Sequence, residues 1–294
     1  MDKSLVKPLV RSFKASLLTL ALTSAATLAA SEVETRDWMP EGSFTNGVEG
    51  PVVGADGSLY AVNIASQGTI GRVTGENQGE LWLQLPDGST GNSLRFHNGL
   101  LYVADYTGHN VLQIDPQSRK IQRRFHNPDM HQPNDIAIAA DGTIYASDPD
   151  WAGNSGQLWR ISPDGEFTLL EKGMGTTNGI ELSPDGKKLY LNESVQRRVW
   201  VYDVKENGDI ANKQLLLAFE DHGLDGMQTD VQGKLYITRY GAGVVLKVAP
   251  DGTLLRTIRL KGQHPTNIAL SADGKTGFVT MQQRGAIEAF STEY

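Results

Sequence analysis

The stretch from Asp135 to Ala146 reads DIAIAADGTIYA and contains the unit from which the fold can be predicted. A short apolar run at residues 136–139 is followed by the pair Asp141-Gly142 and by a second apolar run at residues 144–146. An Asp-Gly pair supplies the positive φ angles that a two-residue hairpin turn requires. The stretch therefore predicts two antiparallel strands joined by a tight turn.

The same hairpin recurs along the chain at a nearly constant interval. Its aromatic residue stands at Tyr60, Tyr102, Tyr145, Tyr190, Tyr236 and Phe278, at spacings of 42, 43, 45, 46 and 42 residues. A third strand is expected at residues such as 157–161, and a fourth at residues such as 254–258. Four antiparallel strands in each of six such units are typical of propeller blades, so we predict an all-β fold, a six-bladed β-propeller.

The last repeat is too short to supply four strands of its own. Its third strand is expected near residues 286–290, and the sequence ends at Tyr294. We expect residues 33–39 to add the fourth strand, because this pairing closes the ring and leaves no open sheet edge. A solenoid built from the same repeat is the alternative, but no capping repeats are visible.

Residues 1–30 differ in composition from the rest of the chain. Lys3, Lys7, Arg11 and Lys14 make a basic start, and residues 17–30 form an uncharged apolar stretch that ends in small residues. This is the layout of a secretory signal peptide, and it is shorter than the roughly 20 residues of a membrane span. We expect a signal peptide over residues 1–30, a propeller domain over 31–294, and a periplasmic or secreted protein. An uncleaved anchor is the alternative.

The composition excludes several functions. The chain has no cysteine, which rules out disulfides, thiolate zinc sites and cysteine nucleophiles. Its net charge is −7, without a basic run, which argues against nucleic-acid binding. It also lacks the Gly-x-Ser-x-Gly motif of serine hydrolases. We expect a monomer that acts on a small molecule and has no membrane span after the signal peptide.

One polar position recurs at the start of the predicted innermost strands. Counting back 10 to 12 residues from each aromatic gives Glu49, Asn92, Asn134, Asn178, Asp225 and Asn267. All six are carboxylates or carboxamides, and the first strand of every blade lines the central channel. Oxygen ligands of this kind suit a hard cation, and Ca²⁺ accepts roughly six to eight of them. The alternative is a hydrated polar channel without a metal.

Four motifs in order, at blade spacing, carry a family resemblance. They are Glu49-Gly50-Pro51, Gln132-Pro133-Asn134-Asp135, Thr177-Asn178-Gly179 and Leu224-Asp225-Gly226-Met227. On these motifs the chain resembles the SMP-30/gluconolactonase/luciferin-regenerating-enzyme family of six-bladed propellers. The resemblance implies that Glu49, Asn134, Asn178 and Asp225 hold a divalent metal, usually calcium. It also implies lactone hydrolysis with Asp225 as the catalytic base or nucleophile.

The resemblance leaves two other functions open. Some relatives hydrolyse phosphotriesters, and a propeller can also bind a ligand or protein around a metal that is only structural. Sugar-lactone members often have Arg where this chain has Gln132. Glutamine is shorter and uncharged, so this position is expected to contact substrate differently.

A second set of positions lies three residues before the polar ring. It contains His131, His222 and His264, which are expected on loops at the metal end of the channel. Histidine there can shuttle protons or contact substrate, although exposed loops also tolerate it. Together with Gln132, Asn92 and Asn267, these histidines are the predicted substrate-binding residues.

Overall fold

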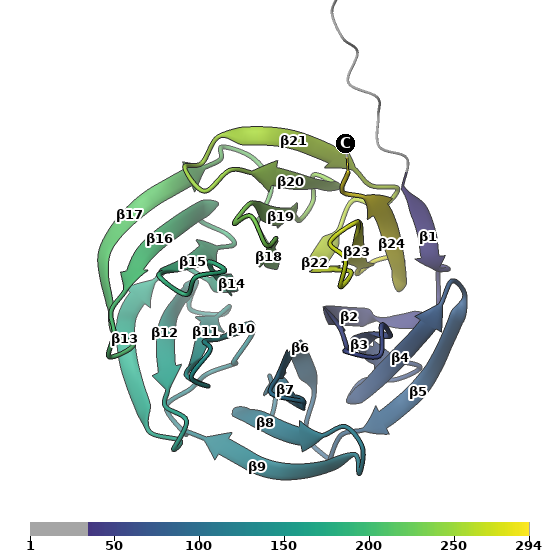
Figure 1. Cartoon of the computed structure of the whole chain (residues 1–294), viewed down its shortest axis with the longest axis horizontal. Coiled ribbons are helices and arrows are strands. Elements are labelled where there is room, and N and C mark those ends of the chain that lie inside the picture. Colours follow the sequence, from purple (N-terminus) through teal and green to yellow (C-terminus); the bar gives the residue numbers. More distant parts are fainter. Residues whose placement is uncertain (1–34, 294) are drawn as a thin grey trace, which may run out of the picture. The chain divides into compact units, whose positions relative to one another are not determined.

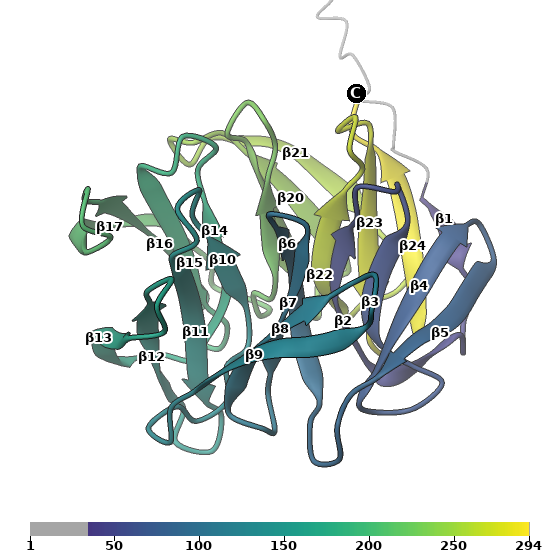
Figure 2. The same ribbon diagram turned by 60° about the horizontal axis from the view of Figure 1, so that its bottom comes forward.

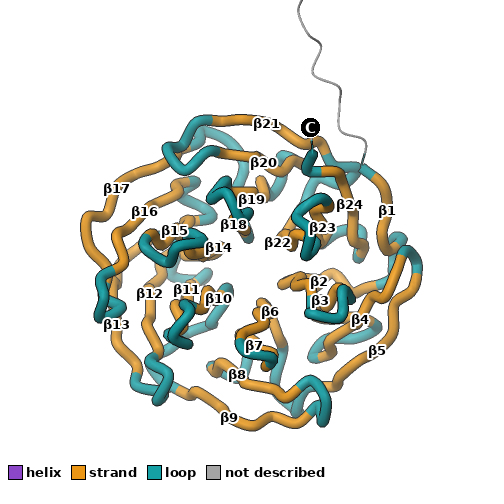
Figure 3. The backbone as a smooth tube through the Cα atoms, in the orientation of Figure 1, coloured by secondary structure: helices purple, strands orange, loops and turns teal. Residues whose placement is uncertain are grey.

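The computed structural model describes residues 35–293, so the predicted signal peptide lies outside the described range. Within that range, 24 strands form six four-stranded antiparallel sheets arranged in a ring (Figure 1). Residues 35–293 contain no helix (Figure 3), and hence none long and apolar enough to cross a membrane. The predicted six-bladed propeller is confirmed.

The strands run outward from the centre of the ring in chain order within each of the first five blades (Figure 1). Blade 1 comprises β2 (Phe44–Val53), β3 (Leu59–Ile64), β4 (Thr69–Gly75) and β5 (Gln78–Gln84). Blade 2 comprises β6 (Gly91–His97), β7 (Leu100–Asp105), β8 (Asn110–Asp115) and β9 (Lys120–His126). Blade 3 comprises β10 (Ile136–Ile138), β11 (Ile144–Asp150), β12 (Ser155–Ile161) and β13 (Phe167–Met174). Blade 4 comprises β14 (Thr177–Leu182), β15 (Lys188–Glu193), β16 (Arg198–Val204) and β17 (Ile210–Ala218). Blade 5 comprises β18 (Met227–Thr229), β19 (Leu235–Arg239), β20 (Val244–Val248) and β21 (Leu254–Arg259).

Blade 6 is completed by the opposite end of the domain, as predicted. It contains β22 (Pro265–Leu270), β23 (Thr276–Met281) and β24 (Ala286–Ser291), and β1 (Arg36–Met39) pairs antiparallel with β24. Arg284 reinforces this closure, because its guanidinium lies 2.9 Å from the Asp37 carboxylate on β1. Figure 1 shows β1 and β24 side by side at the rim of the ring.

The recurring aromatic residue of the sequence has a common packing role. Six apolar clusters lie between neighbouring blades, and each contains the second-strand aromatic of one blade together with residues of the next. Tyr60, for example, packs with Leu94 and Val103 of blade 2. The repeat is therefore visible in the sequence because every blade needs the same large side chain to seal its contact with the following one.

Candidate functional site

The inner strands, which carry or closely follow the predicted polar ring, surround the centre of the propeller (Figures 1 and 2). Glu49 and Asn178 lie within β2 and β14, and Asn92 lies within β6. Asn134 and Asp225 each stand two residues before a short inner strand of three residues, β10 or β18. Segments far apart in sequence thus place their polar side chains around one axis.

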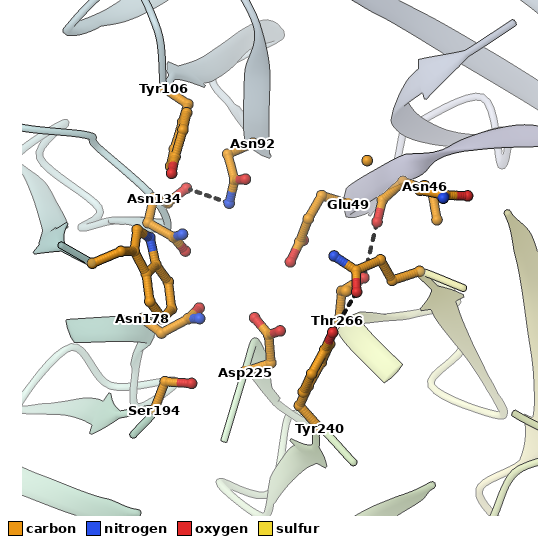
Figure 4. A pocket seen from close by; sticks show the side chains of 14 residues that line it. Asn46, Glu49, Asn92, Tyr106, Asn134, Asn178, Ser194, Asp225, Tyr240 and Thr266 are labelled. Atoms are coloured by element: carbon orange, nitrogen blue, oxygen red, sulfur yellow. Dashed lines mark hydrogen bonds between the residues drawn. The ribbon is translucent and has the colours of Figure 1, made fainter. Parts of the chain in front are cut away.

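Five of the six ring residues line one cavity of about 360 Å³: Glu49, Asn92, Asn134, Asn178 and Asp225. Figure 4 shows the carboxylates of Glu49 and Asp225 and the amide of Asn178 pointing toward the same space. These three side chains come from three different blades. The cavity is therefore where an oxygen-rich site can form.

The amide oxygens of this site lack partners within the protein. The exposed fractions of Glu49, Asn134, Asn178 and Asp225 are 8%, 5%, 2% and 9%. The Oδ1 atoms of Asn134 and Asn178 are buried and accept no hydrogen bond from any described residue. An unpaired buried acceptor costs free energy, so these oxygens favour an occupant that is a cation or a hydrogen-bond donor.

The environment of the two carboxyl groups in the site disfavours their ionised forms. Burial raises the pKa of Glu49 well above its ordinary value, and the charges of Asp225 and Asp135 raise it further. Burial likewise raises the pKa of Asp225, with the charge of Asp135 adding to the effect. A bound cation would relieve this repulsion, because it favours the ionised form of each carboxylate.

The donor set matches a hard divalent cation. No group of three or more His, Cys, Asp or Glu side chains in residues 35–293 is arranged to hold a metal. A cation in this cavity would therefore depend on two carboxylates together with amide oxygens. Oxygen-only ligation of this kind fits Ca²⁺ or a similar ion better than Zn²⁺, which prefers nitrogen and sulfur ligands.

Hydrogen bonds between blades fix the segments that carry these polar side chains. The Asn92 side chain donates to the Asn134 carbonyl oxygen at 3.3 Å, which links blades 2 and 3. The Thr266 hydroxyl donates to the carbonyl oxygen of Val48 at 3.0 Å, which links blades 6 and 1. The site is therefore preorganised by the closed ring rather than by any single blade.

Glycines follow three of the four predicted ligand positions because neighbouring blades approach closely there. A Cβ atom on Gly179 would lie 2.4 Å from the carbonyl oxygen of Asp225, and one on Gly50 would lie 2.4 Å from that of Asn92. Real Cβ atoms do not make such contacts, so the backbone next to each ligand would have to move. This explains the Glu-Gly and Asn-Gly pairs seen in the sequence.

We expect Gly179→Ala to destabilise the fold by about 2 kcal/mol, since overpacking a tight contact forces the backbone apart. The displaced backbone carries both Asn178 and Asp225, so metal affinity should fall as well. Thermal unfolding and calcium titration measure the two effects. Gly223→Ala is the matched control, because its Cβ would lie 3.6 Å from the nearest atom. Equal melting temperatures and equal calcium affinities in the two variants would contradict this explanation of the glycine.

Asn267 departs from its predicted role as a substrate contact. It does not line the cavity, and it is fully buried. Its amide nitrogen donates to both Asp135 oxygens, at 3.0 and 3.1 Å, and its Oδ1 accepts the Ile268 amide at 2.9 Å. Both ends of the side chain thus have partners within the protein, and Asn267 holds the buried Asp135 carboxylate.

A buried ion pair between Arg95 and Glu181 lies near Asp135. Arg95 lies 3.6 Å from Glu181, and both side chains are almost completely buried. Burial raises the pKa of Glu181 to about 7, although the Arg95 charge opposes the shift. The same arginine opposes the rise that burial produces in the pKa of Asp135. Arg95 is therefore the compensating charge for two buried carboxyl groups.

This shift gives the metal-free protein a pH-dependent stability. Between the ordinary pKa of 4.5 and about 7, folded Glu181 keeps a proton that the unfolded chain has lost. Raising the pH across this window therefore removes stability, by about 3 kcal/mol in total. We expect Glu181→Gln to abolish this part of the decline, as measured by denaturant unfolding with chelator from pH 4.5 to 7.5. Parallel profiles of the two proteins would show that Glu181 does not titrate in this window.

The predicted substrate-binding residues divide into three groups in the structure. Asn92 lines the main cavity, whereas His131 and Gln132 line an adjoining pocket. His222 is exposed and lies 4.0 Å from the Asp221 carboxylate. His264 packs edge-on against Tyr240, with ring centroids 4.6 Å apart. Neither His222 nor His264 lines the cavity or its adjoining pocket, although His264 contacts Tyr240, which does line the cavity.

The structure also adds cavity residues that the sequence analysis missed. They are Gly47, Val48, Tyr106, Trp151, Ser194, Tyr240, Thr266 and Gln282, whereas Asn46 holds the same position, three residues before the polar ring, as the predicted histidines. Tyr106, Trp151, Ser194, Tyr240 and Gln282 share one property: each directly follows the second strand of its blade. Their signal in the sequence is a position four to six residues after the recurring aromatic.

The comparisons with known proteins agree with the architecture and show the family of the chain. The chain belongs to the SMP-30/gluconolactonase/LRE-like family, whose sequence model matches residues 48–283. A gluconolactonase from Xanthomonas campestris superposes with a TM-score of 0.74 at 17% identity, covering 88% of this chain and 89% of that one. At this identity the likeness shows the fold alone.

Two relatives are similar in sequence over most of the propeller. A gluconolactonase from Zymomonas mobilis is 31% identical over 208 residues, which cover 62% of this chain and 58% of that protein. A diisopropyl-fluorophosphatase from Loligo vulgaris is 25% identical over 212 residues, or 65% of each chain. The chain thus spans less than two thirds of the length of either relative.

Proposed function

We propose that this protein is an exported, calcium-dependent hydrolase of lactones. The observation that carries the proposal is the meeting of two buried carboxylates and two unpartnered amide oxygens in one open cavity. Relatives named as lactonases support the choice of lactone as substrate. The basic and apolar start of the sequence supports export.

The four proposed ligands are Glu49, Asn134, Asn178 and Asp225. A divalent cation bound there would polarise the substrate carbonyl and stabilise negative charge that develops on its oxygen. The chain itself supplies the proton transfer. Asp225 accepts a proton from the attacking water as the water oxygen bonds to the carbonyl carbon. The same proton then passes to the ring oxygen as the C–O bond breaks, giving the hydroxy acid.

Asn92 and Gln132 are proposed to orient the substrate. Asn92 lines the main cavity, although its amide nitrogen is engaged with Asn134, so its oxygen is the atom available to a substrate hydroxyl. Gln132 lies in the adjoining pocket and is uncharged, so it can hydrogen-bond a substrate but cannot neutralise an anion. These contacts favour an uncharged lactone.

The proposal is tested with a substrate panel. The mature chain, loaded with calcium, is assayed against lactones of different ring size and against phosphotriesters. We expect hydrolysis of at least one lactone class. Turnover confined to phosphotriesters would favour the second candidate, which the likeness to a diisopropyl-fluorophosphatase supports. Absence of turnover on the whole panel would favour a non-catalytic propeller with a structural metal.

A further inference from the structure

We call the residues that directly follow the second strands the rim, and five of the six blades contribute theirs to the cavity lining. The residues that directly follow the second strands are, in order around the ring, Ala65, Tyr106, Trp151, Ser194, Tyr240 and Gln282. All except Ala65 line the cavity. The polar ring contains similar side chains in every blade, whereas the rim side chains differ in size and polarity from blade to blade. A rim residue is therefore suited to discriminate among substrates.

The rim is aromatic on two adjacent blades. Tyr106 and Trp151 line the main cavity and also the adjoining pocket, which has a volume of about 360 Å³. Tyr106 and Trp151 are therefore shared walls of the main cavity and of a second, adjoining space. Trp151 is 38% exposed, whereas Trp82 and Trp159 are 5% and 6% exposed in the blade cores. Trp151 thus presents apolar surface to this opening rather than filling a core.

The loop segments around the adjoining pocket are held in place. The Asp148 carboxylate accepts hydrogen bonds from the backbone N–H groups of His131, at 3.0 Å, and Gln132, at 2.6 Å. The Asp150 carboxylate accepts the Gly153 amide at 2.9 Å, which closes the turn that carries Trp151. A pocket with such fixed walls needs little reorganisation on binding.

Acidic side chains outnumber basic ones among the described residues that line the two spaces. Among the described residues, neither space is lined by lysine or arginine. The carboxylates of Glu49 and Asp225 face the main cavity, and Asp150 lines the adjoining pocket. An anionic group on the substrate would meet Asp150 with no lysine or arginine to offset the repulsion, and His131 is the one side chain among the described lining residues that protonation could make cationic.

We propose that the space beside Tyr106 and Trp151 is a subsite for an uncharged, flat apolar substituent next to the lactone ring, and that it rejects anionic substituents. This inference rests on the proposed hydrolase function and specifies its substrate class. Aromatic walls bury the face of such a group, and the fixed pocket leaves room for it beyond the reacting carbonyl.

The test compares three lactones with the same five-membered ring: γ-butyrolactone, its γ-phenyl derivative, and the γ-(4-carboxyphenyl) derivative. With calcium-loaded protein, we expect kcat/KM for the phenyl derivative to exceed that of the parent about tenfold or more. The carboxylated derivative should lose that advantage. Trp151→Ala should lower kcat/KM for the phenyl derivative far more than for the parent, and Trp151→Phe should restore most of the difference.

A binding measurement separates this inference from the proposed function. The γ-phenyl lactam has the same shape as the phenyl lactone and resists hydrolysis, so calorimetry reports its binding to wild type and Trp151→Ala. Trp151-dependent lactam binding without turnover of any lactone would support the subsite and contradict the hydrolase function. Lactone turnover without preference for the phenyl derivative, or with preference for the carboxylated one, would overturn the subsite. A lactam that does not bind would also overturn it.

Discussion

Replacing Asp225 by asparagine is expected to remove lactone hydrolysis while the propeller stays folded. The carboxylate is both a proposed metal ligand and the proposed base, so its loss should lower kcat by on the order of a thousandfold or more. The metal-free variant should be more stable than wild type, because the substitution removes a carboxyl group that burial and Asp135 hold in an unfavourable state. Turnover assays and thermal unfolding measure these opposite effects.

Asp105→Asn is the matched control for the stability part of this prediction. Asp105 is also fully buried, but its carboxylate accepts hydrogen bonds from Ser89, Thr90 and Gly108. Its replacement should therefore destabilise the fold, opposite to the result at Asp225. A wild-type rate in Asp225→Asn would eliminate the assignment of this residue. Single-turnover hydrolysis in ¹⁸O-water tests the base role, since label in Asp225 itself would instead indicate a nucleophile.

Removal of the metal is expected to abolish turnover and to lower the stability of the protein. Without a cation, Glu49 and Asp225 lie in one buried site with raised pKa values, in a cavity that no lysine or arginine of the described residues lines. Calcium at a hundred times its dissociation constant should stabilise the fold by about 2.7 kcal/mol, by mass action alone. The stabilisation should grow as the pH rises from 5 to 8, because protons compete with the metal for the two carboxylates.

The measurements are turnover and thermal unfolding, with chelator and then with calcium in excess. Glu49→Gln is the control variant, since it keeps the size of a proposed ligand but removes its charge. We expect its response to calcium to be much weaker than that of wild type. Full activity of the wild-type protein after exhaustive chelation would contradict the proposed role of the metal, and an unchanged melting temperature would contradict its proposed site.

The fold could be predicted almost completely from the sequence because its signals are local and repeated. Each Asp-Gly or Asn-Gly turn specifies its own hairpin, and each second-strand aromatic seals one contact between blades. The closure of the ring by β1 followed from counting the strands of the last repeat. None of these inferences needed the identity of a distant partner.

The site could be predicted only in part. The motifs at Glu49, Asn134, Asn178 and Asp225 have a common offset from the repeat aromatic, and the structure brings all four to one cavity. Asn267 has the same offset, yet it pairs with Asp135, 132 positions away in the chain. Periodicity cannot separate these outcomes, because a side-chain amide serves equally well as a metal ligand or as a hydrogen-bond donor.

By itself, the sequence determined the number of blades, the strand that closes the ring and the polar residues that face the axis. These features depend on turn chemistry and on a repeated spacing, which act over short stretches of chain. The tertiary structure alone decided which polar residues remain open to the cavity and which are consumed by buried pairs. It also decided that Tyr106 and Trp151 share a second pocket, since only the closed ring sets neighbouring loops side by side.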